Sequence, residues 1–176
     1  MLRAKYAWVA AQLKPENIID FEIAAVPKPI QSVRFSARAG YVQTFQPKAN
    51  KDWKRMIKLT VAEQLPPGWK PFEDTPLWVR TIYVFPELKS FTKKERQLIA
   101  EGCVLFKYTK PDVNDNLNKG LYDALTGVVW DDDSRVAFAE SYKLYGEEAG
   151  IVVSVGTLPK VIKKGLKDDY VQQRVP

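Results

Sequence analysis

A stretch from Leu77 to Phe85 combines the two-residue alternation of a β-strand with apolar side chains on both of its faces. One face would carry Leu77, Val79, Thr81 and Tyr83, and the other Trp78, Arg80, Ile82 and Val84. A strand that is apolar on both sides has to be covered on both sides. We therefore expect this strand to lie in the centre of a sheet.

Shorter alternating segments predict the other strands. They lie at 21–25, 41–45, 104–108, 136–141 and 151–155. We expect the last two to form a hairpin through the turn from Gly146 to Gly150. The basic segment from Lys28 to Arg38 contains no acidic residue and is predicted to be a loop.

Apolar residues at spacings of three and four predict helices. One helix is expected over 48–65, and another over Leu117–Leu125, where Thr126-Gly127 would stop it. Thr92 and Glu95 have the spacing of a capping box and are expected to open a short helix between these two.

These elements predict a mixed α/β fold (α+β) with a single compact domain, in which helices pack on a mixed β-sheet. The domain is expected over residues 20–158, after a weakly helical N-terminal extension (1–19) and before a basic C-terminal tail (159–176). The chain contains no apolar run near the roughly 20 residues that cross a bilayer, and its start lacks a signal-peptide core. We therefore expect an intracellular protein.

The residue types that are missing narrow the chemistry. The 176-residue chain has no histidine and one cysteine, Cys103. A Ser-His-Asp triad, a Cys-His pair, a histidine general base and an internal disulfide are therefore excluded, and the usual zinc ligands are lacking. Any bound metal must be held by oxygen, which favours Mg²⁺ or Mn²⁺.

Charge is unevenly distributed along the chain. The window from Asp112 to Asp133 holds six aspartates and one lysine, Lys119, in a protein of net charge +6. Without this window the chain keeps 26 basic and 15 acidic residues, a net charge of +11. A basic surround attracts a polyanion, whereas clustered carboxylates repel it unless a cation intervenes. The pattern suggests a metal-dependent enzyme that acts on nucleic acid.

Within this window, Asp112 ends an extended segment, Asp115 begins a helix and Asp133 precedes the next strand. A strand-helix-strand unit of this length is expected to bring its two ends together, so that carboxylates from both ends share a cation. Such a cation stabilises the charge that develops on a phosphate during hydrolysis and lowers the pKa of a bound water. Lys119 would place its ammonium near the scissile phosphate or hold a carboxylate in position.

Each of these residues also has a purely structural interpretation. Asp115 and Lys119 have the spacing of an ordinary ion pair on a helix surface, and Asp115 also suits a helix N-cap. The run Asp131-Asp132-Asp133 is typical of a turn before a strand, and Asn116 and Asn118 can be ordinary polar helix residues. These alternatives stay open at the level of the residues.

The same residues resemble the signature of a known family. Asp115-Asn116-Leu117-Asn118-Lys119, Asp123-Ala124-Leu125, Gly127, Asp132-Asp133 and Val136 are similar in type and spacing to the RusA-type Holliday junction resolvases, common in phages and prophages. The resemblance covers about residues 20 to 158. It implies a mixed α/β, Mg²⁺-dependent homodimeric endonuclease that cuts opposed strands of four-way DNA junctions in recombination and repair, in the cytoplasm of a bacterial host cell.

By this resemblance, the catalytic and metal-binding aspartates are Asp112, Asp115 and Asp133, Asp132 supports the metal, and Lys119 is the essential lysine. We expect contacts with the DNA backbone from the basic segment and from the lysine-rich helix. The residues expected to make these contacts are Lys28, Arg34, Arg38, Lys48, Lys51 and Lys110.

One departure from the family pattern bears on the site. The family reads Asp-x-Asp-Asn, but this chain reads Asp112-Val113-Asn114-Asp115-Asn116, one residue more. In a rigid strand the extra residue would turn Asp112 to the opposite face, whereas a bulge or loop would absorb it. Either Asp112 still binds metal through a bulge, or Asn114 supplies a neutral oxygen.

The leading hypothesis is therefore a homodimeric structure-selective endodeoxyribonuclease. A second hypothesis is a junction-binding protein in which the extra residue has abolished catalysis. It predicts binding of four-way junctions without cleavage in any metal. A third is an unrelated metal nuclease that acts on flaps or single strands.

Overall fold

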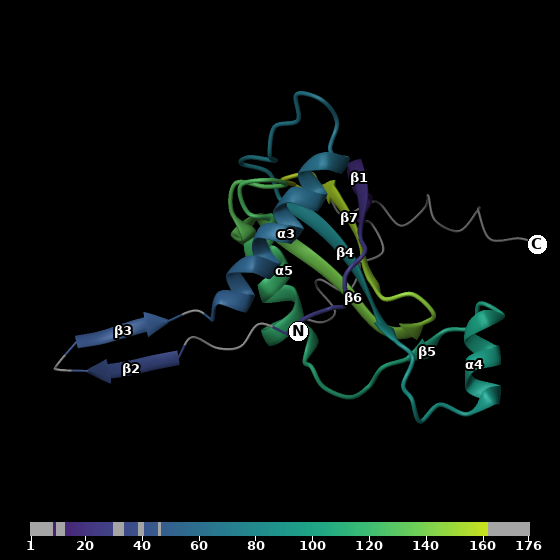
Figure 1. The fold of residues 1–176 in the computed structure, drawn as a ribbon. Helices are drawn as coiled ribbons and strands as arrows, with labels where there is room; N and C mark the ends of the chain where they lie inside the picture. Colours follow the sequence, from purple (N-terminus) through teal and green to yellow (C-terminus); the bar gives the residue numbers. More distant parts are fainter. Residues whose placement is uncertain (1–8, 10–12, 30–33, 39–40, 46, 162–176) are drawn as a thin grey trace, which may run out of the picture.

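The computed structural model describes residues 9, 13–29, 34–38, 41–45 and 47–161. These form a five-stranded sheet with the strand order β1-β7-β4-β6-β5, and a separate two-stranded hairpin of β2 and β3. In Figure 1, α3 and α5 lie over one face of the large sheet, and α4 lies beyond one end of it. The predicted mixed α/β fold, with helices packed on a mixed sheet, is confirmed.

The boundaries of the elements are as follows. The strands are β1 (Glu16–Ile23), β2 (Arg34–Arg38), β3 (Tyr41–Phe45), β4 (Leu77–Pro86), β5 (Leu105–Phe106), β6 (Val136–Gly146) and β7 (Gly150–Thr157). The helices are α3 (Lys48–Gln64), α4 (Lys93–Ala100) and α5 (Lys119–Leu125). Two short helical turns, η1 (Val113–Asn118) and η2 (Asp133–Arg135), precede α5 and β6.

Strand β4 occupies the centre of the sheet, as its apolar pattern predicted. It pairs in parallel with β6 on one side and antiparallel with β7 on the other. Leu77, Val79 and Tyr83 are at most 1% exposed and lie in the core under the helices. The strand that is apolar on both faces is therefore the central strand of the sheet.

The expected hairpin of β6 and β7 is wrong, because β4 lies between these strands. The connection from Gly146 to Gly150 instead passes over the end of β4. It runs so close to β4 that a Cβ atom at Gly146 would lie 2.7 Å from Cγ1 of Val84. Glycine is therefore needed where the chain crosses the central strand.

The three predicted helices are present. Helix α3 buries Ile57 and Val61 completely, and α4 begins with the expected capping box of Thr92 and Glu95. Helix α5 ends at Leu125, two residues before Gly127, whose φ of +80° suits glycine best. Within the described ranges, no helix is long and apolar enough to cross a membrane.

Several boundaries differ from the expectation, most clearly in the N-terminal extension and in the basic segment. Strand β1 begins at Glu16, within the stretch expected to be an extension, because Glu16 pairs with Thr157 of β7. Arg34–Arg38 is a strand rather than part of a loop, and it pairs with Tyr41–Phe45 in a hairpin that projects away from the large sheet in Figure 1. Most of the N-terminal extension, and the basic tail after residue 161, lie outside the described residues.

The packing of α3 on the sheet predicts unequal effects of two truncations in the same helix. Ile57 is fully buried, whereas Leu59 is 56% exposed. We expect Ile57→Ala to lower the free energy of unfolding by about 2–5 kcal/mol, through lost burial and an internal cavity. Leu59→Ala, the control, should change it by about 0.5 kcal/mol or less. Urea denaturation measures both, and equal losses would contradict the packing described here.

Candidate active site

The segment that carries Asp112 is anchored on strand β6. It follows a cis peptide bond between Lys110 and Pro111. The ammonium of Lys143, on β6, donates hydrogen bonds to the carbonyl oxygens of Thr109 (2.8 Å) and Pro111 (2.7 Å). These bonds join the backbone just before Asp112 to the sheet.

Asp112 then enters a π-helical turn. The amide of Leu117 donates to the Asp112 carbonyl over 3.2 Å, and the amide of Lys119 donates to the Asn114 carbonyl. The first of these bonds spans five residues, and a turn of this width holds one residue more than an α-helical turn. The extra residue before Asp115 is therefore accommodated in a widened helical turn, not in a strand. Whether Asp112 or Asn114 supplies an oxygen to a metal stays a prediction.

The carboxylates of Asp112 and Asp115 both lie exposed on this turn, and Lys119 is exposed at the start of α5. The side-chain amide of Asn116 donates to Oδ2 of Asp112 over 3.3 Å. Asp115 is inside the helical turn rather than at its N-cap, which is Asp112. The turn thus presents two carboxylates and an ammonium along one short segment.

The turn is also tied to the interior through Asn118, which is only 7% exposed. Its Oδ1 accepts from the hydroxyl of Tyr83 over 2.9 Å and from the hydroxyl of Ser141 over 3.1 Å. Its Nδ2 donates to Oδ1 of Asn114 over 3.4 Å. Burial raises the pKa of Tyr83 well above its ordinary value, so the phenol stays protonated and can donate.

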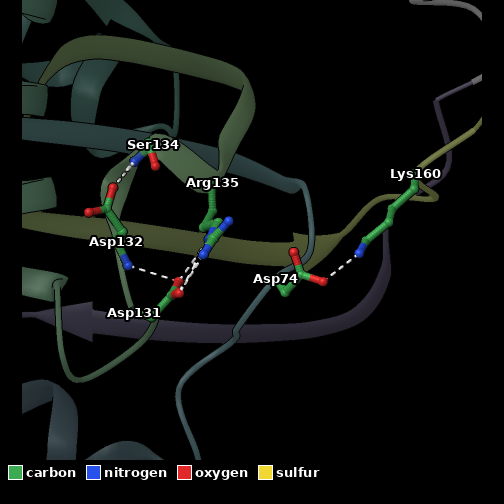
Figure 2. Close-up of polar contacts among 6 residues, drawn as sticks. All are labelled: Asp74, Asp131, Asp132, Ser134, Arg135 and Lys160. Carbon is green, nitrogen blue, oxygen red and sulfur yellow. Dashed lines mark hydrogen bonds and ion pairs between the residues drawn. The ribbon is translucent and has the colours of Figure 1, made fainter.

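The aspartate run at the start of β6 forms a different arrangement, which Figure 2 shows. Asp131 pairs with Arg135 over 2.8 Å, and the hydrogen bond from this guanidinium lowers the pKa of Asp131. Asp132 accepts from the amide of Ser134 over 2.8 Å as the N-cap of η2, and hydrogen bonds from the side chain and the amide of Ser134 lower its pKa. Asp133 is the exposed first residue of η2. Asp131 and Asp132 therefore match the interpretation of this run as a turn before a strand.

The structure does not bring the two groups of aspartates together. Asn118, at the end of η1, contacts Ser141 of β6, whereas Asp133 lies three residues before Val136, where β6 begins. From Val136 to Ser141 the strand spans about 17 Å, at roughly 3.3 Å per residue. Helix α5 runs back along β6. The two ends of the strand-helix-strand unit, which carry Asp115 and Asp133, therefore lie apart. Among the described residues, no group of three or more acidic or cysteine side chains could hold a metal ion.

A shared site for one cation on Asp112, Asp115, Asp132 and Asp133 is therefore not formed within the described chain. Asp112 and Asp115 alone are suited to supply one or two carboxylate ligands to a cation. Mg²⁺ usually keeps several waters and binds through one or two carboxylates together with substrate phosphates. The roles of the four aspartates and of Lys119 stay predictions.

The predicted DNA-contacting residues fall into three groups. Lys48, Lys51 and Lys110 are exposed. Lys28 donates to the carbonyl of Ala49 over 3.0 Å and so supports the start of α3. Arg34 and Arg38 lie in β2, and the positions of their side chains are outside the described part of the structure.

Two other lysines of this lysine-rich helix bind α5 instead. Lys54 pairs with Asp123 over 2.7 Å, and Lys58 donates to the carbonyl of Thr126 over 3.0 Å. The exposed basic face of α3 is therefore narrower than its sequence indicates.

Sequence reasoning missed Lys143, Tyr83 and Ser141 as supports of the turn. The alternating pattern at 136–141 ends before Lys143 and gave no clear signal for it. Asn118 was noticed only as a polar helix residue, although it lies on the same face as Leu121 and Leu125, which are fully buried. A side-chain amide on an apolar helix face requires hydrogen-bond partners in the interior. This requirement was the sequence signal for the residues that support the turn.

Comparison with known proteins identifies the family of the chain. The family model described as Endodeoxyribonuclease RusA matches residues 24–156. The chain is also similar to the Uncharacterized protein YqaN of Bacillus subtilis (strain 168), with 32% identity over 139 residues, which cover 79% of this chain and 96% of that protein. The family model covers β4, β5, β6 and most of β7, the turn that carries Asp112 and Asp115, and the aspartate run before β6. The chain belongs to the RusA endodeoxyribonuclease family.

Proposed function

We propose that this endodeoxyribonuclease resolves four-way DNA junctions, by hydrolysing phosphodiesters at the turn that carries Asp112 and Asp115. The observation that supports this most directly is the exposed pair of carboxylates on a turn anchored to the sheet, with Lys119 one helical turn after Asp115. Membership of the family favours this over the flap-nuclease hypothesis. The cell compartment we propose is the bacterial cytoplasm, and the gene a phage or prophage gene that acts in recombination and repair.

The cation that we propose is Mg²⁺, with Mn²⁺ as a substitute. When bound, such an ion supplies charge stabilisation at the phosphate and a more acidic water. The chain's own contribution is to hold the carboxylates of Asp112 and Asp115 exposed at a fixed spacing. Lys119 neutralises a phosphate oxygen beside them, because its ammonium is a compact donor on a flexible stem.

The protein's basic surface would hold the arms of the junction. Lys48 and Lys51 are exposed at the start of α3, and the hairpin of β2 and β3 leads into this helix (Figure 1). Contacts of lysine and arginine with phosphates position DNA without reading its sequence. We propose that these elements and Lys110 recognise the shape of the junction.

The first test is nicking of a labelled synthetic four-way junction in Mg²⁺, Mn²⁺ or EDTA. We expect paired nicks that require metal and that Asp115→Asn reduces at least 100-fold, because a metal ligand and local charge are lost. Asp74→Asn is the matched control, since Asp74 pairs with Lys160 away from the turn. Binding of the junction without nicks in any metal would instead favour the junction-binding alternative.

The separation of Asp133 from Asp115 leads to a specific proposal about the homodimer. If carboxylates from both ends of α5 act on one phosphate, they must come from different copies of the chain. A dimer of one Asp115→Asn chain and one Asp133→Asn chain would then keep one complete site and lose the other.

Mixed dimers of these two inactive variants test this proposal. We expect the mixture to recover single nicks in the junction, whereas each variant alone gives none. If the two aspartates acted within one chain, every site of the mixed dimer would lack one of them and no nick would appear. Nicking by Asp133→Asn alone would show that Asp133 is not required.

A further inference from the structure

The aspartate-bearing turn is held at two points by one patch of the central sheet. Lys143 bonds the carbonyl of Pro111, just before the turn, and Ser141 bonds Asn118, at its end. Ser141 and Lys143 are two residues apart on β6, and Tyr83 of β4 pairs in register with Lys143. The three side chains therefore approach the turn from the same face of the sheet.

We propose that Asn118 is a positioning residue that sets the placement of Asp112 and Asp115. The proposal rests on the function proposed above for this turn. Asn118 does not reach solvent and would not touch DNA or metal. It acts through Asn114, which lies two residues after Asp112 and immediately before Asp115.

The hydrogen bonds of Asn118 leave little freedom in the orientation of its amide. Two hydroxyl groups, of Tyr83 and Ser141, donate to its oxygen, so its nitrogen is directed at Asn114. The buried phenol of Tyr83 stays protonated because its pKa is raised, which keeps it a donor. A buried amide that loses such partners is costly, so the arrangement resists rotation.

Asn114 transmits this constraint to the carboxylates. Its side chain accepts from Asn118, and its carbonyl accepts from the amide of Lys119, within the widened turn. A π-helical turn is less regular than the α-helix that follows, and such turns often occur at functional sites. Without Asn118, the turn can return toward α-helical hydrogen bonding, which would shift Asp112 relative to Asp115.

This inference also explains how the chain tolerates its extra residue. The widened turn takes up the residue, and Asn114, within the lengthened segment, is bonded to the buried amide. The register from Asp115 through Leu125 then continues unchanged into α5. The extra residue widens the turn and Asn118 fixes its shape, so that both carboxylates stay on the exposed side.

The experiment compares Tyr83→Phe and Asn118→Leu with the wild type in two measurements. The first is hydrogen exchange of the Leu117 and Lys119 amides, which make the hydrogen bonds of the turn. The second is the dissociation constant for Mg²⁺ without DNA, from calorimetry. Tyr83→Phe removes one hydroxyl and keeps the ring. We therefore expect this variant to fold even if Asn118→Leu, the larger change, prevents folding.

We expect both variants to speed exchange of these two amides at least tenfold and to weaken Mg²⁺ binding by a factor of about three to ten. In nicking assays, the Mg²⁺ concentration at half-maximal rate should rise, while binding of the junction in EDTA stays unchanged. Tyr83→Phe added to Asn118→Leu should have no further effect, because both changes break the same chain of hydrogen bonds.

The control is Thr81→Val, which removes a hydroxyl from a fully buried residue on the same face of β4, two positions before Tyr83. The Thr81 hydroxyl lies near the hydroxyl of Tyr122 and makes no hydrogen bond to Asn118. If Tyr83→Phe and Asn118→Leu change exchange and Mg²⁺ affinity no more than Thr81→Val does, the positioning role is overturned. If the wild type cuts no junction while exchange still responds, the proposed function fails and the positioning role stands.

Discussion

The site depends on the packing of α5 along β4 and β6. Leu121, Ala124 and Leu125 are fully buried against the sheet, so the helix cannot slide or rotate without exposing apolar surface. This packing places the turn with Asp112 and Asp115 at one end of the helix. It places the loop to Asp131 at the other end, where Phe72 accepts a hydrogen bond from the amide of Asp131 and donates one to the carbonyl of Val129.

A second constraint follows from the polar groups that this packing buries. Tyr83, Asn118 and Ser141 form a connected set of hydrogen bonds beneath the turn. A satisfied buried network restricts the core to one arrangement, whereas an apolar contact tolerates small shifts. In the function that we propose, this restriction keeps Asp112 and Asp115 at a fixed spacing.

The two basic features of the protein serve different purposes. On α3, Lys54 and Lys58 are bonded to α5 and stabilise the helix pair. Lys48 and Lys51 lie on the exposed surface beside the hairpin of β2 and β3. The count of 27 basic residues therefore overstates the number available to a polyanion, because Lys54 and Lys58 are bonded between α3 and α5.

Much of the local structure can be predicted from the residues alone. The position of β4, the capping box at Thr92 and the end of α5 before Gly127 depend on short patterns of apolar spacing, capping and backbone freedom. The family also follows from the sequence, because the type and spacing of residues around Asp115 and Lys119 are specific. Each of these depends on neighbours within a few positions along the chain.

Only the tertiary structure decided how those pieces meet. It placed β4 between β6 and β7, set Asp133 apart from Asp115, and brought Lys143 and Tyr83 to the turn. It also placed the extra residue in a widened helical turn rather than in a strand. These outcomes depend on pairing between residues distant in sequence, whose register is set by burying the whole sheet and its helices at once. The sequence alone determined which chemical groups are present, and the packing of α5 on the sheet determined which of them act together.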